Sequence, residues 1–258
     1  MATHQAPAVT RAIAVLRLLA HEREGLGVNA IARALGMVPS SCLHILRALA
    51  EDGMVQVDAE TKRYSLGLGL LTLARDMLGR NHFALQVQPE LERIARDYAA
   101  TATAVELDGR ERMVVVAVAQ APTLLRIQVG VGSRFPAWIS ATGRCVAAAS
   151  GLSRAALRQR FDALKWQSPP RFEQWLREIE QARRDGFAVD VGSYIAGFTI
   201  VAAPVGDGGP VRRAVSVVCV SEQLADARLA ALARDAKEAA RRVGGRLGGH
   251  LPARVTAA

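Results

Sequence analysis

Residues 28–49 read VNAIARALGMVPSSCLHILRAL, and this stretch decides the fold of the amino-terminal region. Apolar residues recur at one-face helical spacing on both sides of Gly36. Gly36 stands where the first helix must end and turn, a place where a residue that takes positive φ costs least. Pro39 follows close to the first position of the next helix, where its missing N–H loses nothing. Two short helices around a glycine turn predict a helix-turn-helix, whose second helix reads the major groove of DNA.

The flanking segments predict a winged version of this motif. A further helix is expected over about residues 9–21. Beyond the reading helix, two short β-prone runs enclose the charged turn 58–63, which predicts a hairpin. Three helices and a hairpin make a winged helix-turn-helix over residues 1–67, with Lys62 and Arg63 at the tip of the wing.

Several side chains of this region are candidates for contact with DNA. Those that fall off the apolar stripe of the reading helix are Ser40, Ser41, His44 and Arg47. Hydroxyls and helix-terminal N–H groups suit phosphates, and an arginine suits a phosphate or a guanine edge. Arg11, Lys62 and Arg63 are further phosphate candidates. The competing interpretation is a solvated surface with no role in DNA binding.

The second half has a different pattern. An apolar helix over 68–82 precedes it and is expected to pack against a partner subunit or the second domain. A helix over 83–100 follows, then β-prone runs and helices that end in a helix over about 223–247. Expected strands cover 103–107, 113–119, 124–129, 187–190, 199–205 and 211–220. Mixed hairpins and helices without a βαβ repeat predict an α+β sensor-like domain.

Composition restricts the class of protein. Half of the 258 residues are hydrophobic and 22% are charged, which excludes wholesale disorder. The net charge of +9 suits a polyanionic partner. Residues 1–81, however, carry nine Lys/Arg and seven Asp/Glu, so charge is weak support for DNA binding. We expect a cytoplasmic protein, because there is no signal-like leader and no apolar run long enough to span a membrane.

Catalytic, metal and cofactor motifs are weak. Cys42, Cys145 and Cys219 lie far apart in apolar contexts, which predicts buried free thiols. The histidines never occur at i, i+4 and have no cysteine at zinc spacing. His44 shares a short helix with two serines but has no acid to orient it. We therefore expect no enzyme activity, metal or cofactor.

Short segments in both halves carry a family resemblance. They are RAIAVL at 11–16, IARALG at 31–36, LRAL at 46–49, EDG at 51–53, RYSLG at 63–67, ATGRC at 141–145, DGFAVD at 185–190, Gly197, AAPV at 202–205 and AVSV at 214–217. Their order and spacing resemble the IclR family of bacterial transcriptional regulators, in which ATGRC corresponds to an A-x-G-K-A segment.

The resemblance implies three parts: a winged helix-turn-helix (1–67), a linker helix (68–82), and a GAF-like effector-binding and oligomerisation domain with an antiparallel sheet (83–250). It also implies double-stranded operator DNA as a partner and a homodimer or a dimer of dimers. A small organic effector, often a carboxylate, would change operator occupancy.

The effector pocket is also implied by the resemblance. The matching positions are Ala141, Thr142, Asp190, Phe198, Ile200, Ser216 and Val218. The helix amino end at Thr142 is an anion site by local physics alone, whereas the other residues are open to a purely structural interpretation. Val191-Gly-Ser193 stands where the family commonly has an acidic pair, and nearby Trp138 and Tyr194 favour a flat or aromatic effector.

Two alternatives stay open. One is an effector-independent DNA-binding protein with a degenerate sensor domain. The other is a cytosolic enzyme that uses the Asp190 pocket.

Overall fold

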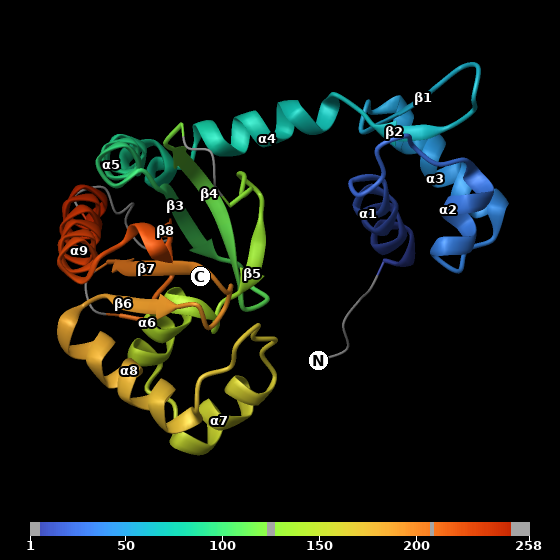
Figure 1. Ribbon diagram of the computed structural model, residues 1–258. Coiled ribbons are helices and arrows are strands. Elements are labelled where there is room, and N and C mark those ends of the chain that lie inside the picture. The colour runs from blue at the N-terminus through green and yellow to red at the C-terminus, as the bar shows by residue number, and fades with distance from the viewer. Residues whose placement is uncertain (1–5, 123–126, 207–208, 249–258) are drawn as a thin grey trace, which may run out of the picture. The chain divides into compact units, whose positions relative to one another are not determined.

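The computed structural model describes residues 6–122, 127–206 and 209–248. The chain consists of two compact units, which divide between Arg80 and Asn81 (Figure 1). The elements of the first unit are α1 (Pro7–Leu19), α2 (Val28–Ala34), α3 (Pro39–Glu51), β1 (Val55–Val57), β2 (Tyr64–Leu66) and α4 (Gly69–Gly79). Within the described residues, no helix is long and apolar enough to cross a membrane.

The first unit is a winged helix-turn-helix, as predicted. Its core contains the buried Val15, Ile31, Cys42 and Leu46 from three helices. Strands β1 and β2 pair antiparallel to form a small wing. Tyr64 ties the wing to the loop before α2, because its N–H donates to the carbonyl of Leu26 at 2.8 Å and its own carbonyl accepts from the Leu26 N–H at 2.9 Å.

The second unit is an α+β domain built on one antiparallel sheet of order β5-β4-β3-β8-β7-β6. Its strands are β3 (Thr101–Leu107), β4 (Arg112–Gln120), β5 (Arg134–Pro136), β6 (Ala188–Val191), β7 (Phe198–Val205) and β8 (Arg213–Val220). Its helices are α5 (His82–Tyr98), α6 (Ser140–Ser150), α7 (Arg154–Asp162), α8 (Phe172–Asp185), η1 (Ser221–Gln223) and α9 (Asp226–Gly248).

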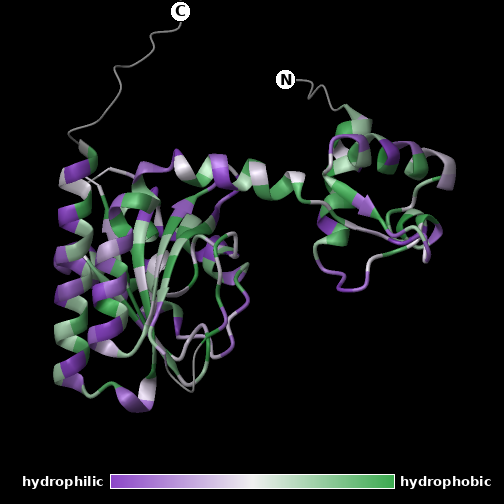
Figure 2. Cartoon of the chain, turned by 90° about the horizontal axis from the view of Figure 1, so that it is seen from above, coloured by the Kyte–Doolittle hydropathy of each residue, from purple (hydrophilic) through white to green (hydrophobic). Residues whose placement is uncertain are grey.

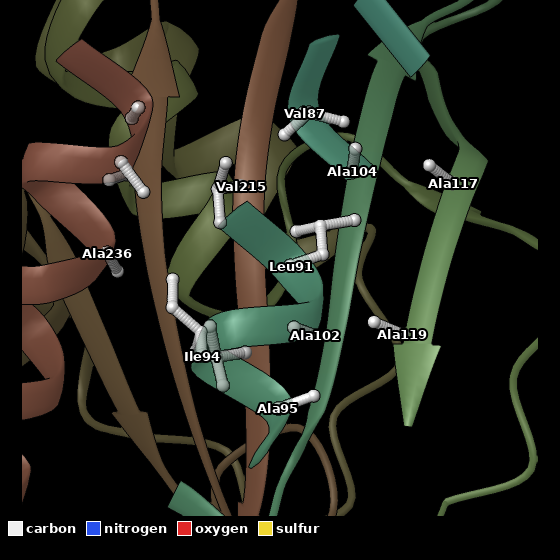
Figure 3. Close-up of a cluster of buried hydrophobic side chains, with 14 of the residues drawn as sticks. Val87, Leu91, Ile94, Ala95, Ala102, Ala104, Ala117, Ala119, Val215 and Ala236 are labelled. Atoms are coloured by element: carbon white, nitrogen blue, oxygen red, sulfur yellow. The ribbon is translucent and has the colours of Figure 1, made fainter. Parts of the chain in front are cut away.

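Helices cover both faces of this sheet. Helices α5 and α9 lie on one face and α6 and α8 on the other (Figure 1). Side chains of α5, among them Val87, Leu91 and Ile94, point at the alanines of β3 and β4 (Figure 3). Small alanines let the helix approach the sheet closely, which explains how a chain poor in aromatic residues fills its core. Hydrophilic and hydrophobic residues alternate along α9, the long helix at the left of Figure 2, as expected of a helix packed on one side.

One expected strand is wrong in the part of it that the structure describes. Of the run 124–129, residues 124–126 lie outside the described residues, and 127–129 are not in a strand. The sheet instead ends at β5, which pairs Phe135 with Met113 of β4. A three-residue edge strand that contains proline has no alternation for sequence analysis to detect.

Candidate functional site

The outer face of α3 displays three of the four residues predicted to read DNA. Ser40, His44 and Arg47 are exposed and lie on one face, since their spacing is i, i+4, i+7. The opposite face buries Cys42 and Leu46 in the core of the unit. Ser41 is half-buried, so its hydroxyl is less available than the other three side chains.

The amino end of α3 is itself a place for a phosphate. Pro39 occupies the first turn, and among the described residues no side chain caps the helix. The N–H groups of Ser40 and Ser41 therefore lack a carbonyl within the helix. Such groups bind phosphate together with the positive end of the helix dipole.

The wing is held by an aspartate turn. Oδ1 of Asp58 accepts hydrogen bonds from the Thr61 N–H at 2.6 Å, the Thr61 hydroxyl at 2.8 Å and the Glu60 N–H at 3.0 Å. The two bonds from Thr61 lower the pKa of Asp58. Lys62, with φ of +56°, is exposed at the tip. Arg63 instead reaches back, 3.7 Å from Glu24. Arg11 is exposed on α1.

The two wing cations are expected to contribute differently to DNA binding. Lys62→Ala removes a cation that forms no ion pair with the described carboxylates, and it should reduce the slope of log affinity against log salt by ~0.9. Arg63→Ala should reduce it less, because Glu24 already neutralises part of that charge. Fluorescence anisotropy on a bound duplex over a salt series measures both slopes. An equal loss in the two variants would show that Arg63 leaves Glu24 when DNA binds.

In the second unit, the sheet brings the predicted effector residues onto one face. The register pairs Asp190 with Ile200 and Ile200 with Val218, in one row across β6, β7 and β8. Phe198 and Ser216 lie two residues along the same strands and so share this face. Helix α6 covers it, and its Ala141 packs with Ile200 in a small buried cluster.

Asp190 is fully engaged within the protein. Its side chain is 1% exposed, and Oδ1 accepts from the Ser193 N–H at 2.9 Å while Oδ2 accepts from Nη1 of Arg144 at 3.3 Å. Arg144 is equally buried and also donates through Nε to Glu178 at 2.7 Å. Both carboxylate oxygens of Asp190 already have partners, which is typical of a structural carboxylate rather than a free general base.

Sequence reasoning missed Arg144 as a functional position. It stands at the lysine position of the A-x-G-K-A segment, and it is the only cation between Ala141 and Ala149. A charged residue in an otherwise small and apolar helix is a signal of a buried partner, because an unpaired buried charge is very costly. The partner itself cannot be identified from this signal.

The amino end of α6 is shielded from solvent and carries polar groups without partners. Ser140 is 3% exposed with φ of +63°, a value that non-glycine residues rarely adopt. Its hydroxyl and the indole N–H groups of Trp138 and Trp166 have no hydrogen-bond partner among the described residues. Trp166 also lies against Arg144, one helical turn beyond Ser140, with its ring centre 5.9 Å from the guanidinium carbon.

Thr142 is 1% exposed in the first turn of α6. The first bond of the helix runs from the Gly143 N–H to the Ile139 carbonyl at 2.8 Å. The N–H groups of Ala141 and Thr142 come before it and have no acceptor within the helix. This helix end therefore combines main-chain donors and a buried hydroxyl, and Trp138 stands two residues before Ser140.

The cysteine prediction is confirmed: Cys42, Cys145 and Cys219 are buried and free. Burial raises the pKa of Cys145 to about 12, so its thiol stays protonated. Among the described residues, no group of three or more His, Cys, Asp or Glu side chains is placed to hold a metal ion.

Known proteins match both units. Residues 8–59 match the IclR helix-turn-helix domain, and residues 76–244 match the family described as bacterial transcriptional regulator IclR C-terminal. The glycerol operon regulatory protein of Streptomyces coelicolor is 30% identical over 76% of this chain and 78% of its own length. The transcriptional repressor AllR of Escherichia coli is 24% identical over 94% of this chain and 91% of its own.

A solved structure agrees with these matches. The IclR transcriptional regulator of Alicyclobacillus acidocaldarius has a TM-score of 0.81 and 28% identity, covering 94% of this chain and 99% of that one. Members of the family bind operator DNA through the helix-turn-helix and a small-molecule effector through the C-terminal domain, and they are not enzymes. The chain therefore belongs to the IclR family of bacterial transcriptional regulators.

Proposed function

We propose that this protein binds a palindromic operator as a homodimer, and that a small carboxylate bound at the amino end of α6 changes its affinity for that operator. The carrying observation is that the buried Ser140 hydroxyl and the indole N–H groups of Trp138 and Trp166 have no hydrogen-bond partner among the described residues. Each such group costs about 1–3 kcal/mol when it is left without a partner. A ligand that accepts hydrogen bonds from them removes this cost.

The chemistry of the site favours an acceptor-rich, flat ligand. The helix end and the Ser140 hydroxyl donate to a carboxylate, and the rings of Trp138 and Trp166 suit a planar or aromatic body. Arg144 is already neutralised by Asp190 and Glu178. We therefore assign Asp190 and Arg144 to holding α6 in place, and the neutral donors to the ligand.

Dimerisation is supported by an apolar surface in the first unit. Among the described residues, none in α4 is buried, and Leu71, Leu73 and Met77 are each more than half exposed. Val9 and Ile13 of α1 are exposed as well. Three large exposed apolar side chains on one 11-residue helix are more than the scattered ones a monomer normally shows, and they indicate a protein–protein contact. A dimer places two reading helices about 34 Å apart, which matches the half-sites of a palindrome.

A charge placed on α4 tests this dimer. Leu71→Glu is expected to convert the dimer to a monomer and to weaken operator binding at least about tenfold, because one reading helix then binds without the other. Light scattering coupled to size exclusion gives the mass, and Thr72→Glu, which adds the same charge on the polar side of α4, is the control. A monomeric wild-type protein, or an L71E variant that remains dimeric, contradicts the proposal.

The effector proposal is tested in two steps. Duplexes that the wild-type protein binds are first selected from a random pool. The Arg47→Ala variant should no longer bind the selected duplexes specifically, whereas the Arg33→Ala variant, changed on α2, should still do so. Thermal shift then screens aliphatic and aromatic carboxylates against their amides. The acid should raise the melting temperature and alter duplex binding. Ser140→Ala should lower the affinity for the acid about tenfold, because it removes one hydrogen bond to a charged group.

The outcomes separate this proposal from the effector-independent alternative and show whether the acid binds at Ser140. Specific duplex binding without a response to any acid supports the effector-independent alternative. An acid that binds wild type and Ser140→Ala equally lies elsewhere in the domain. Loss of duplex specificity in the wild-type protein removes the regulatory proposal altogether.

A further inference from the structure

A hollow of about 1150 Å³ lies at the end of the sheet opposite the α6 amino end. Its walls are formed by the last residues of β3 and β7, the first residues of β8, and the last turns of α6 and α8. The rise of an α-helix puts the two ends of α6 about 15 Å apart. The hollow is therefore a place separate from the proposed effector site.

The charge around this hollow is strongly positive. Its ionisable lining side chains are Arg183, Arg212, Arg213, Lys237, Arg241 and Glu106. The rest of the lining is small or apolar, with Ala148, Ala149 and Pro204 among it, and this leaves the space open. A concave surface on which positive charge predominates concentrates the field and attracts anions.

Some of these cations are neutralised and others are not. Arg213 pairs with Glu106 at 2.6 Å, Arg183 with Glu180 at 2.7 Å, and Arg241 with Glu238 at 3.1 Å. Lys237 and Arg212 form no ion pair with any carboxylate of the described residues. Counting the described residues alone, the hollow thus retains two positive charges without an ion-pair partner.

The position of Lys237 depends on a glycine. Gly186 ends α8 with φ of +73°, and a side-chain carbon added there would lie 3.1 Å from Cε and 3.4 Å from Nζ of Lys237. The missing side chain leaves room for the lysine stem to cross the end of α8. Lys237 therefore lines the hollow from α9, although α9 packs on the other face of the sheet.

We propose that this hollow binds a small, multiply charged anion, a polyphosphate or a polycarboxylate, through Lys237 and Arg212. Two uncompensated cations over small apolar walls suit a ligand with at least two negative charges. The site is independent of the proposed effector site, so the domain would respond to two ligands of different charge.

Isothermal titration calorimetry on the full chain tests this site. The probes are inorganic pyrophosphate and citrate, with acetate as the singly charged control at matched ionic strength. At least one polyanion should bind the wild type, and Lys237→Gln and Arg212→Gln should each weaken it about tenfold. Arg234→Gln removes one exposed charge from the same helix α9 outside the hollow and should leave binding unchanged.

The two probes distinguish the source of the anion. Pyrophosphate alone indicates a phosphorylated ligand, and citrate alone indicates a polycarboxylate. The proposal is overturned if neither binds, or if Arg234→Gln weakens binding as much as Lys237→Gln. It is also overturned if Lys237→Gln alters the oligomer without affecting anion binding, because the hollow is then a contact between copies of this chain.

Discussion

Replacing Gly143 with alanine is expected to destabilise the effector unit by about 3 kcal/mol or more, although alanine is the better helix former. The added Cβ would lie 2.0 Å from both the carbonyl carbon and the carbonyl oxygen of Trp138. These are backbone atoms, which cannot rotate away as a flexible side chain does. Helix α6 would have to shift along its whole length, and it packs on β6, β7 and α8.

The measurement uses the natural position of the tryptophans. All three, Trp138, Trp166 and Trp175, lie in the second unit, so their fluorescence reports its unfolding alone. For a unit of this size the melting temperature should fall by about 10 °C. The matched control is Gly245→Ala in α9, where nothing lies within 4 Å of the new carbon. Alanine there should stabilise by about 0.5–1 kcal/mol, so the two substitutions have opposite signs.

An unchanged melting temperature for Gly143→Ala would mean that α6 is loosely held. Its amino end would then not be a preformed binding site. The same variant should destabilise the second unit only. Circular dichroism should show that the helix-turn-helix remains folded.

The structure of the helix-turn-helix unit could be predicted from the sequence because its contacts are local. Ile31, Cys42 and Leu46 follow helical spacing, and all three are buried in one cluster. Gly36 has φ of +60°, as its place between two helices predicts. Each of these features depends on neighbours within a few turns of the chain, so pattern and turn chemistry suffice to predict it.

The proposed effector site could be predicted only in part from the sequence. The strand positions taken from the family resemblance do lie on one face of the sheet, beneath α6, which carries Ala141 and Thr142. The resemblance did not show that Asp190 pairs with a residue 46 positions away. Such a pair depends on the strand register of the whole domain. Ser140 adds a second difficulty, because a serine at positive φ has no signature in the sequence.

Arg144→Met is the second substitution with a large expected effect, a loss of about 3–5 kcal/mol from the effector unit. Methionine fills similar space but leaves the Asp190 carboxylate buried at 1% exposure with only backbone donors. Glu178 is 28% exposed and can turn to water, so the cost falls mainly on Asp190. The melting temperature should drop on the order of 10 °C.

A double-mutant cycle separates lost charge pairing from lost packing. Asp190→Asn keeps an acceptor for the Ser193 N–H while it removes the charge, so Arg144→Met with Asp190→Asn should be more stable than additivity predicts, by about 1–3 kcal/mol. Arg158→Met on α7 is the control, since its pair with Asp162 has both side chains more than half exposed and should cost less than about 1 kcal/mol. Urea unfolding followed by tryptophan fluorescence gives all four free energies. Additive losses would mean that Arg144 serves only to fill space, and the assignment of the pair to holding α6 over the proposed effector site would then be wrong.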